Sequence, residues 1–139
     1  MRIELSPNRK LTELKKDFNT LFSFLKLEFY ANAHKDFELS NHADLLDDDL
    51  VLSEIGFTQN GSVFYEFSDN TTVKEMEQYW KTELGLNIQV FKFFAGVWIE
   101  TSKTDHWSLR QQSEMCESAS DPNKIFTSEK HDYDLEDKR

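Results

Sequence analysis

The sequence predicts a single α+β domain made of two diverged copies of one strand–helix–strand unit. First, residues 3–24 align with residues 65–86 at a shift of 62 positions, and the identities include Glu4 with Glu66 and Glu13 with Glu75. Second, the apolar positions of the two segments keep the same phase through a strand pattern and a helix pattern. Third, a length of 139 residues is typical of one domain.

The first copy starts with a half-buried strand, because Ile3 and Leu5 alternate with polar residues. Pro7-Asn8 ends this strand, since both are turn residues. A helix follows, and its apolar stripe has helical spacing: Leu11, Leu14, Phe18, Leu21, Phe22 and Leu25. Residues 25–30 are typical of a second strand.

The second copy repeats this order after residue 65, with an apolar helix stripe of Val73, Met76, Trp80 and Leu84. Thr72 and Glu75 have the spacing of a capping box, which predicts that the helix begins at Val73. Gly85 is a natural stop for it. The strand that follows, residues 87–93, aligns with the first copy at a shift of 63, so that Leu27 meets Val90.

Two such units in succession favour a ferredoxin-like split βαβ sheet, with the first and third strands side by side in its centre. Gly96 allows a turn into a fifth, antiparallel strand at 97–101 beside the fourth. Ser108 and Gln111 have capping-box spacing and predict a C-terminal helix from residue 107 to about 115. An alternative is another α/β sandwich in which the two units pack side by side.

The domain is expected to span residues 1–115, with the internal repeat at 3–30 and 65–93 joined by an acidic linker, 31–62. Within the linker, Asp47 to Asp49 precede an apolar run and predict a short helix, because carboxylates suit a helix start. Residues 116–139 are polar and lack periodicity, which predicts a disordered acidic tail.

The formal net charge of -10 disfavours nucleic acids and anionic membrane surfaces as partners. No segment approaches the roughly 20 apolar residues of a membrane helix. The single cysteine, Cys116, excludes an internal disulfide and fits a reducing compartment. Since the first residues also lack a signal-peptide pattern, we expect a cytoplasmic protein.

The sequence holds no constellation typical of catalysis. Glycine-rich phosphate loops and paired zinc ligands are absent. His34 and His42 flank acidic residues, but their spacing favours a solvated linker over a metal site. Asp105-His106 favours a helix cap with an exposed histidine over an acid–base pair. We therefore expect no catalytic residue, metal or cofactor, and an enzyme is the least favoured alternative.

The candidate binding surface is the sheet face that points away from the helices. If Ile3, Leu5 and Tyr65 face the helices, alternate residues face outward. The outward set comprises Glu4, Glu66, Phe64, Tyr30, Phe91 and Phe93. Its two carboxylates occupy equivalent strand positions and could share a proton, bind a cation or hold a basic side chain, or lie in solvent balanced by lysines. Its aromatic rings indicate a protein interface, unless the C-terminal helix or the linker covers them.

Three segments, 3–8, 87–91 and 97–107, resemble a set of small conserved bacterial proteins with no assigned activity. The resemblance covers residues 1–115 and excludes the tail. It implies a bacterial origin, and its motifs are structural, so that no functional residue is carried over.

We expect a non-catalytic interaction or structural module that contacts a copy of itself or another protein through the sheet face or a strand edge. The alternative is a regulatory domain that binds a small molecule or a cation on the same face through Glu4 and Glu66, an expectation that rests on analogy between folds.

Overall fold

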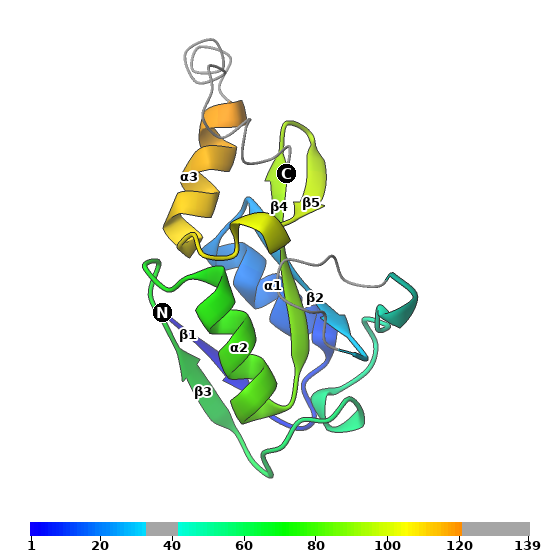
Figure 1. Ribbon diagram of the computed structural model, residues 1–139. Helices are drawn as coiled ribbons and strands as arrows, with labels where there is room; N and C mark the ends of the chain where they lie inside the picture. The colour runs from blue at the N-terminus through cyan, green and yellow to red at the C-terminus, as the bar shows by residue number, and fades with distance from the viewer. Residues whose placement is uncertain (33–41, 121–139) are drawn as a thin grey trace.

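The computed structural model describes residues 1–32 and 42–120 and confirms an α+β fold (Figure 1). In chain order its strands and helices are β1 Arg2–Leu5, α1 Leu11–Leu21, β2 Leu25–Tyr30, β3 Val63–Glu66, α2 Val73–Leu84, β4 Asn87–Phe94, β5 Val97–Glu100 and α3 Leu109–Ser120. Short 3-10 helices occupy His42–Asp44, Leu52–Glu54 and Ser102–Thr104.

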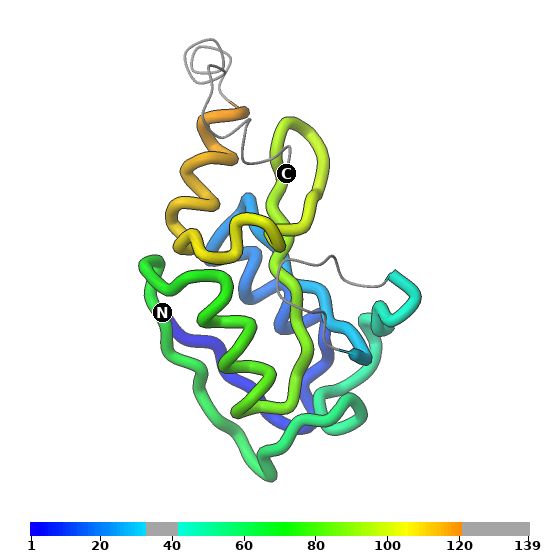
Figure 2. The backbone as a smooth tube through the Cα atoms, in the orientation of Figure 1, coloured from blue at the N-terminus to red at the C-terminus, as the bar shows by residue number. Residues whose placement is uncertain are grey.

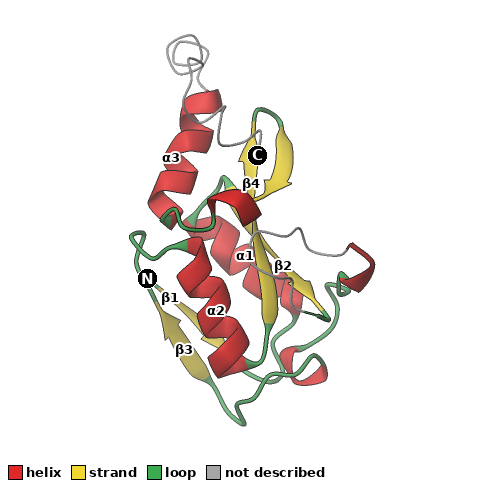
Figure 3. Cartoon of the chain, viewed as in Figure 1, coloured by secondary structure: helices red, strands yellow, loops and turns green. Residues whose placement is uncertain are grey.

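The strands form two antiparallel sheets (Figure 3). β1 pairs with β3, as the sequence predicts, and β5 lies beside β4, also as predicted. β2 pairs with β4 along its whole length. The single-sheet order of a ferredoxin-like domain is therefore not confirmed, because the two outer strands of that order pair with each other.

Both ladders are symmetric about a pair of residues that the sequence repeat aligns. In the first ladder Ile3 lies opposite Tyr65, which is 62 positions later in the chain. In the second, Leu27 lies opposite Val90, 63 positions later. In each ladder a strand of the first strand–helix–strand unit is therefore paired with its counterpart in the second unit.

The same relationship continues beyond the strands. The segment after each unit returns to the start of that unit's helix and bonds to it: the Leu11 N–H donates to Leu50 O at 2.9 Å, and the Val73 N–H donates to Trp107 O at 3.1 Å. These two acceptors are 57 positions apart. Figure 2 shows the second return, where the chain after β5 passes the N-terminal end of α2.

Each returning segment anchors itself with one buried leucine. Leu52 and Leu109 are both 0 % exposed, and their N–H groups donate to Arg9 O and Thr71 O, again 62 positions apart. The predicted Ser108–Gln111 capping box forms at the second return. The short helix predicted after Asp49 begins at Leu52 and is a single 3-10 turn.

The core lies between the two helices and the two sheets. The apolar stripes of α1 and α2 pack in this core against the inward-facing side chains of both sheets. Trp80 of α2 is fully buried, with its ring centroid 5.6 Å from that of Tyr65 and 6.2 Å from that of Phe29. Leu21, which the pattern also placed in the stripe of α1, is 39 % exposed because the helix ends there.

The sequence predicts the C-terminal end of α2 correctly but places the end of α3 too early. α2 runs from Val73 to Leu84, with Thr72 and Glu75 forming the predicted capping box and Gly85 ending the helix in the left-handed conformation, also as predicted. α3 runs to Ser120, so residues 116–120, which the periodicity assigned to the tail, belong to a helix that fully buries Cys116. The rest of the expected tail, residues 121–139, lies outside the described residues.

Candidate functional site

The predicted outer face is divided between the two sheets. One half of it, on β1 and β3, carries Glu4, Phe64 and Glu66. The other half, on β2 and β4, carries Tyr30, Phe91 and Phe93. The six residues therefore do not form one surface, because β2 pairs with β4 and not with β3.

On β1 and β3 the outward side chains alternate basic, acidic and aromatic. The Arg2 guanidinium carbon lies 4.3 Å from the ring centroid of Phe64, and that ring is 48 % exposed. Glu4 is directly opposite Phe64, and its carboxylate accepts a hydrogen bond of 2.6 Å from the Ser62 hydroxyl. Aromatic residues and arginine are enriched at protein contact surfaces.

Glu4 and Glu66 are not opposite each other in the ladder. Glu66 is opposite Arg2, and Glu4 is opposite Phe64, so the two carboxylates occupy diagonal positions. Diagonal positions in an antiparallel pair are about 7–8 Å apart at the Cα atoms, and here an arginine stands across from one of them. This arrangement does not favour a shared proton, and it leaves both carboxylates accessible to a basic group.

The aromatic residues of the other sheet lie mostly against their own neighbours. The ring centroids of Phe93 and Trp98 are 5.1 Å apart, and the Lys26 ammonium lies 4.9 Å from the centroid of Trp98. Phe91 and Phe93 are half-buried. Tyr30 is only 5 % exposed, so it adds no surface to the predicted aromatic patch.

A groove runs between β3 and α2 and is the strongest candidate contact site. One hollow of about 470 Å³ is lined by Phe64, Tyr65, Glu66, Thr71, Glu75 and Tyr79. A second hollow of about 130 Å³ shares Phe64, Tyr65 and Tyr79 and continues toward Glu83. We call the two together the β3 groove. Its rim carries three glutamates, and two of its rings, Phe64 and Tyr79, are 48 % and 45 % exposed.

The β3 groove follows the edge of the strand, because its lining includes side chains from both faces of β3. Phe64 and Glu66 point outward, whereas Tyr65 points into the core and is 7 % exposed. Tyr65 and Tyr79 have ring centroids 5.2 Å apart, which joins the strand to the helix at the base of the groove. A groove bordered in this way exposes backbone as well as side chains.

The hydrogen-bond alternation of the ladder shows which backbone groups face the groove. Met1 and Phe67 exchange both N–H···O bonds, at 3.0 and 2.9 Å, so they form a hydrogen-bonded pair. In an antiparallel ladder the next such pair is two residues along, which is Ile3 with Tyr65. The N–H and C=O groups of Phe64 and Glu66 therefore point away from β1, toward the open edge.

The base of the β3 groove favours the protonated form of Tyr65. Burial, with the nearby Glu75 carboxylate and the Tyr79 phenol, raises the pKa of Tyr65 to about 12. Burial, the main cause of this shift, penalises a charge of either sign, whereas the Glu75 carboxylate would also stabilise a positive charge at the rim.

Sequence reasoning missed the helical wall of this groove. Glu75, Tyr79 and Glu83 recur every four residues along α2, beside the apolar stripe and outside it. A large aromatic residue between two acids on an otherwise polar helix face was the available signal. Without knowing that β3 presents its edge to this helix face, the pattern resembles a solvated surface.

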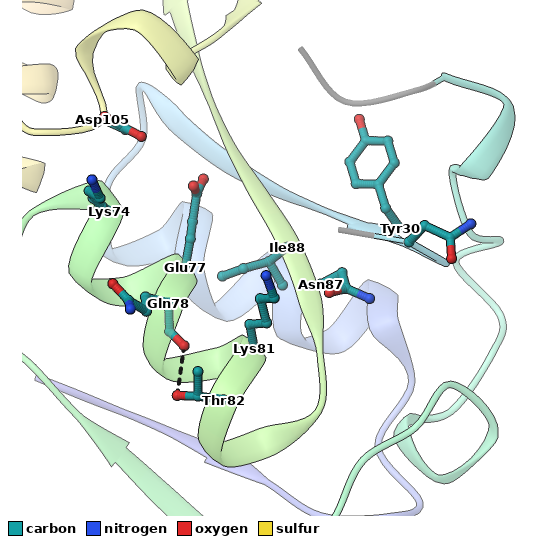
Figure 4. Close-up of a pocket in the computed structure, with 10 residues that line it drawn as sticks. Tyr30, Lys74, Glu77, Gln78, Lys81, Thr82, Asn87, Ile88 and Asp105 are labelled. Carbon is teal, nitrogen blue, oxygen red and sulfur yellow. Dashed lines mark hydrogen bonds between the residues drawn. The ribbon is translucent and has the colours of Figure 1, made fainter. Parts of the chain in front are cut away.

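A separate pocket of about 320 Å³ lies on the other side of α2 (Figure 4). Its lining comes from α2, the adjoining ends of β2 and β4, and the segment before α3: Tyr30, Asn32, Lys74, Glu77, Gln78, Lys81, Thr82, Asn87, Ile88 and Asp105. The Thr82 hydroxyl is tied to Gln78 O at 2.9 Å. The pocket is polar and contains charges of both signs.

In the first unit the equivalent region is filled by an ion cluster. Lys15, which corresponds to Glu77, places its ammonium 2.5 Å from a Glu28 carboxylate oxygen and in contact with Asp48. Burial lowers the pKa of Lys15, but its hydrogen bonds to Asp48 and Glu28 outweigh that effect and leave the pKa above its ordinary value of 10.5. The two units thus use the same scaffold position differently.

The other candidate residues have structural surroundings. Asp105 is 2 % exposed and its carbonyl accepts a hydrogen bond of 2.7 Å from the Lys74 N–H, while His106 is exposed. Among residues 1–32 and 42–120 no group of three or more metal-ligating side chains gathers, and His34 lies outside these ranges. Within the same ranges, none of the helices has the length and apolar character needed to span a membrane.

No family model, no curated protein and no solved structure matches this chain. The resemblance to small bacterial proteins therefore stays a prediction, and the site must be interpreted from its own geometry.

Proposed function

We propose that this protein is a non-catalytic interaction module that binds another protein through the β3 groove. The observation that carries the proposal is the pair of exposed rings, Phe64 and Tyr79, on either side of an open strand edge. Aromatic residues are enriched at interfaces because they bury a large area at a low entropic cost. This proposal narrows the expected sheet-face contact to one edge.

The binding mode that fits this geometry is strand addition. An extended segment of a partner would hydrogen-bond to the outward backbone groups of Phe64 and Glu66. Its alternate side chains would then enter the groove beside Tyr79, which supplies specificity that backbone bonds alone lack. Edge strands that are short, as β3 is, avoid uncontrolled pairing and still accept a matched segment.

Selection of binders from a random peptide library displayed on phage tests the proposal. The full chain is the bait, and the selected peptides are titrated into the isotope-labelled protein by NMR. We expect the largest amide shifts at Phe64, Glu66 and Tyr79. We also expect Phe64→Ala to weaken binding by about tenfold or more, as loss of a central interface ring does.

Val97→Ala is the matched control, because Val97 is also exposed, at 56 %, but lies on β5. It should change the affinity less than about twofold. Peptides whose shifts map to β5 or to the α2 pocket, or whose affinity ignores Phe64→Ala, would contradict the proposal.

A second candidate function is recognition of a small polar molecule in the α2 pocket. Its volume, about 320 Å³, is within the range of ligand sites, at roughly 300–1,000 Å³. An NMR fragment screen tests it: a real ligand shifts Lys81 and Asn87 and weakens on Lys81→Ala but not on Lys16→Ala, an exposed lysine of α1. A screen without such a fragment removes this candidate.

A further inference from the structure

In the first unit, the side chain of Arg9 covers the edge of β1. Its guanidinium donates to the Glu4 carbonyl at 2.8 Å and to the Asp17 carboxylate at 2.8 Å, and lies 3.5 Å from the Glu13 carboxylate. The side chain is only 23 % exposed. Arg9 thus bridges the outward backbone of β1 to the facing wall of α1.

Each residue of this arrangement has a counterpart 62 positions later, and the counterparts line the β3 groove. Glu66, Thr71, Glu75 and Tyr79 correspond to Glu4, Arg9, Glu13 and Asp17. The correspondence holds in the backbone as well, since the N–H groups of Arg9 and Thr71 both donate at 3.1 Å to equivalent serine carbonyls, those of Ser6 and Ser68.

The two units differ at the residue that covers the edge. Thr71 is too short to reach from its turn to the strand edge, and its hydroxyl accepts a hydrogen bond from the Ser68 N–H at 3.1 Å. The strand carbonyl and the first-turn glutamate remain in equivalent positions, as Glu66 and Glu75. The groove of about 470 Å³ lies where Arg9 lies in the first unit.

We infer that the β3 groove binds an arginine side chain carried by the partner's extended segment. This inference rests on the proposed function of the groove as the contact surface. The guanidinium would donate to the Glu66 carbonyl and to the Glu75 carboxylate, as Arg9 does to Glu4 and Glu13. The charge of the chain, -10, favours a cationic partner at long range as well.

The replacement of Asp17 by Tyr79 fits the same ligand. A planar guanidinium stacks on aromatic rings, and Arg2 already lies in this way over Phe64, 4.3 Å from its centroid. The Glu75 carboxylate can cap its helix and bind a guanidinium at the same time. Its counterpart Glu13 does both, since it accepts from the Lys10 N–H at 3.1 Å while it faces Arg9. Glu75 accepts from the Thr72 N–H at 2.8 Å in the same manner.

The first experiment is an NMR titration of the full isotope-labelled chain with three probes. They are N-acetyl-arginine amide, the corresponding lysine amide and the uncharged citrulline amide. We expect shifts at Glu66, Thr71 and Tyr79, with the arginine probe bound at least about fivefold more tightly than the lysine probe, because only arginine presents a planar fork of donors. Equal binding of arginine and lysine, or no shift at these residues, would overturn the inference.

Two variants separate site binding from general attraction to an acidic surface. Thr71→Arg places a guanidinium of the chain itself in the groove and should weaken the affinity for the arginine probe by about tenfold or more. Thr20→Arg makes the same charge change on α1 and should alter that affinity by about twofold at most. Glu75→Gln keeps the capping box, since glutamine caps equally well, and should weaken binding about three- to tenfold. Retained affinity in Thr71→Arg and Glu75→Gln would overturn the inference.

The phage-display selection separates failure of the arginine site from failure of the proposed protein-binding function. Selected peptides that bind the groove and lose at least about tenfold on Arg→Lys replacement support both. Peptides that bind the groove without arginine overturn the arginine site and leave the interaction module standing. Failure to select any peptide that shifts Phe64 or Glu66 overturns both.

Discussion

Ile3 and Tyr65 lie directly opposite each other between β1 and β3, and they are also the residues that the sequence repeat aligns. The same is true of Leu27 and Val90 between β2 and β4. Each strand therefore pairs with its own counterpart. As a consequence, the two units can be compared position by position in their helices, their return segments and their strand edges.

The two units have diverged at a strand edge and at a gap between helix and strand. The first unit covers its strand edge with Arg9 and fills its helix–strand gap with Lys15. The second unit has a groove and a pocket at the two corresponding places. At these two places the second unit is open, whereas the first unit is closed by paired side chains.

The Lys15 cluster should stabilise the fold at neutral pH. Lys15→Met removes the cation from a Glu28 side chain that is only 16 % exposed, so we expect a loss of about 1–3 kcal/mol in the free energy of unfolding. Urea denaturation at pH 7 measures it, and the exposed Lys16→Met is the control, expected within about 0.5 kcal/mol of wild type.

The pH dependence of that difference follows from the direction of the pKa shift. The pKa of Lys15 is higher in the folded state than its ordinary 10.5, so its contribution is complete below pH 10.5 and is lost as the pH rises through the folded pKa. The gap between wild type and Lys15→Met should stay constant from about pH 7 to 9 and close above pH 10.5. A gap that widens at alkaline pH would contradict this account.

Tyr65 should titrate later than an ordinary tyrosine. Its pKa of about 12 exceeds the ordinary value of 10.0, so stability that is present below pH 10 is lost as the pH rises toward 12. The phenolate absorbance of wild type minus that of Tyr65→Phe should show a step near pH 12. A difference step near pH 10 would mean that the base of the β3 groove is open to water.

Gly85 should be far less replaceable than Gly61. Gly85 has a φ of +74° at the end of α2, and a Cβ there would stand 2.4 Å from Gly56 O. We expect Gly85→Ala to cost about 2–4 kcal/mol in thermal or urea unfolding. Gly61→Ala, where no heavy atom would lie within 4 Å of the added Cβ, should stay within about 0.5 kcal/mol. Similar losses for both would contradict the packing described for this turn.

Arg9→Thr makes the first unit resemble the second. The variant loses the bond to the Glu4 carbonyl and the pair with Asp17, so we expect a loss of about 1 kcal/mol, measured by urea denaturation. Lys16→Thr, at an exposed position of the neighbouring α1, controls for the altered charge. No loss in Arg9→Thr would indicate that the guanidinium contributes nothing where it lies, and would weaken the analogy with the β3 groove.

The sequence predicts the elements of this fold well because each depends on local pattern. Val73 begins α2 and Gly85 ends it as the capping box and the glycine indicate. The repeat also predicts that β1 lies beside β3. The pairing of β2 with β4 was not predictable in the same way, because alternation shows which side chains are buried but not which strand edge meets which.

The candidate site was predicted only in part for the same reason. Phe64 and Glu66 are exposed on β3 as expected, since their neighbour Tyr65 belongs to the core. Thr71, Glu75 and Tyr79 could not be assigned to the site, because their role depends on the edge of β3 facing α2. The sequence repeat aligns Arg9 with Thr71. The significance of this difference depends on the bond from Arg9 to the Glu4 carbonyl, which only the structure shows.

Hydrogen exchange at β3, measured by NMR with and without a groove-binding peptide from the display selection, tests the central claim most directly. In the free protein the Tyr65 amide should be protected by its bond to Ile3, while the Phe64 and Glu66 amides exchange quickly because they face the open edge. The peptide should slow exchange at Phe64 and Glu66 by at least about tenfold, as paired strand amides do. Slow exchange at both residues in the free protein, or fast exchange that persists with the peptide bound, would contradict the account.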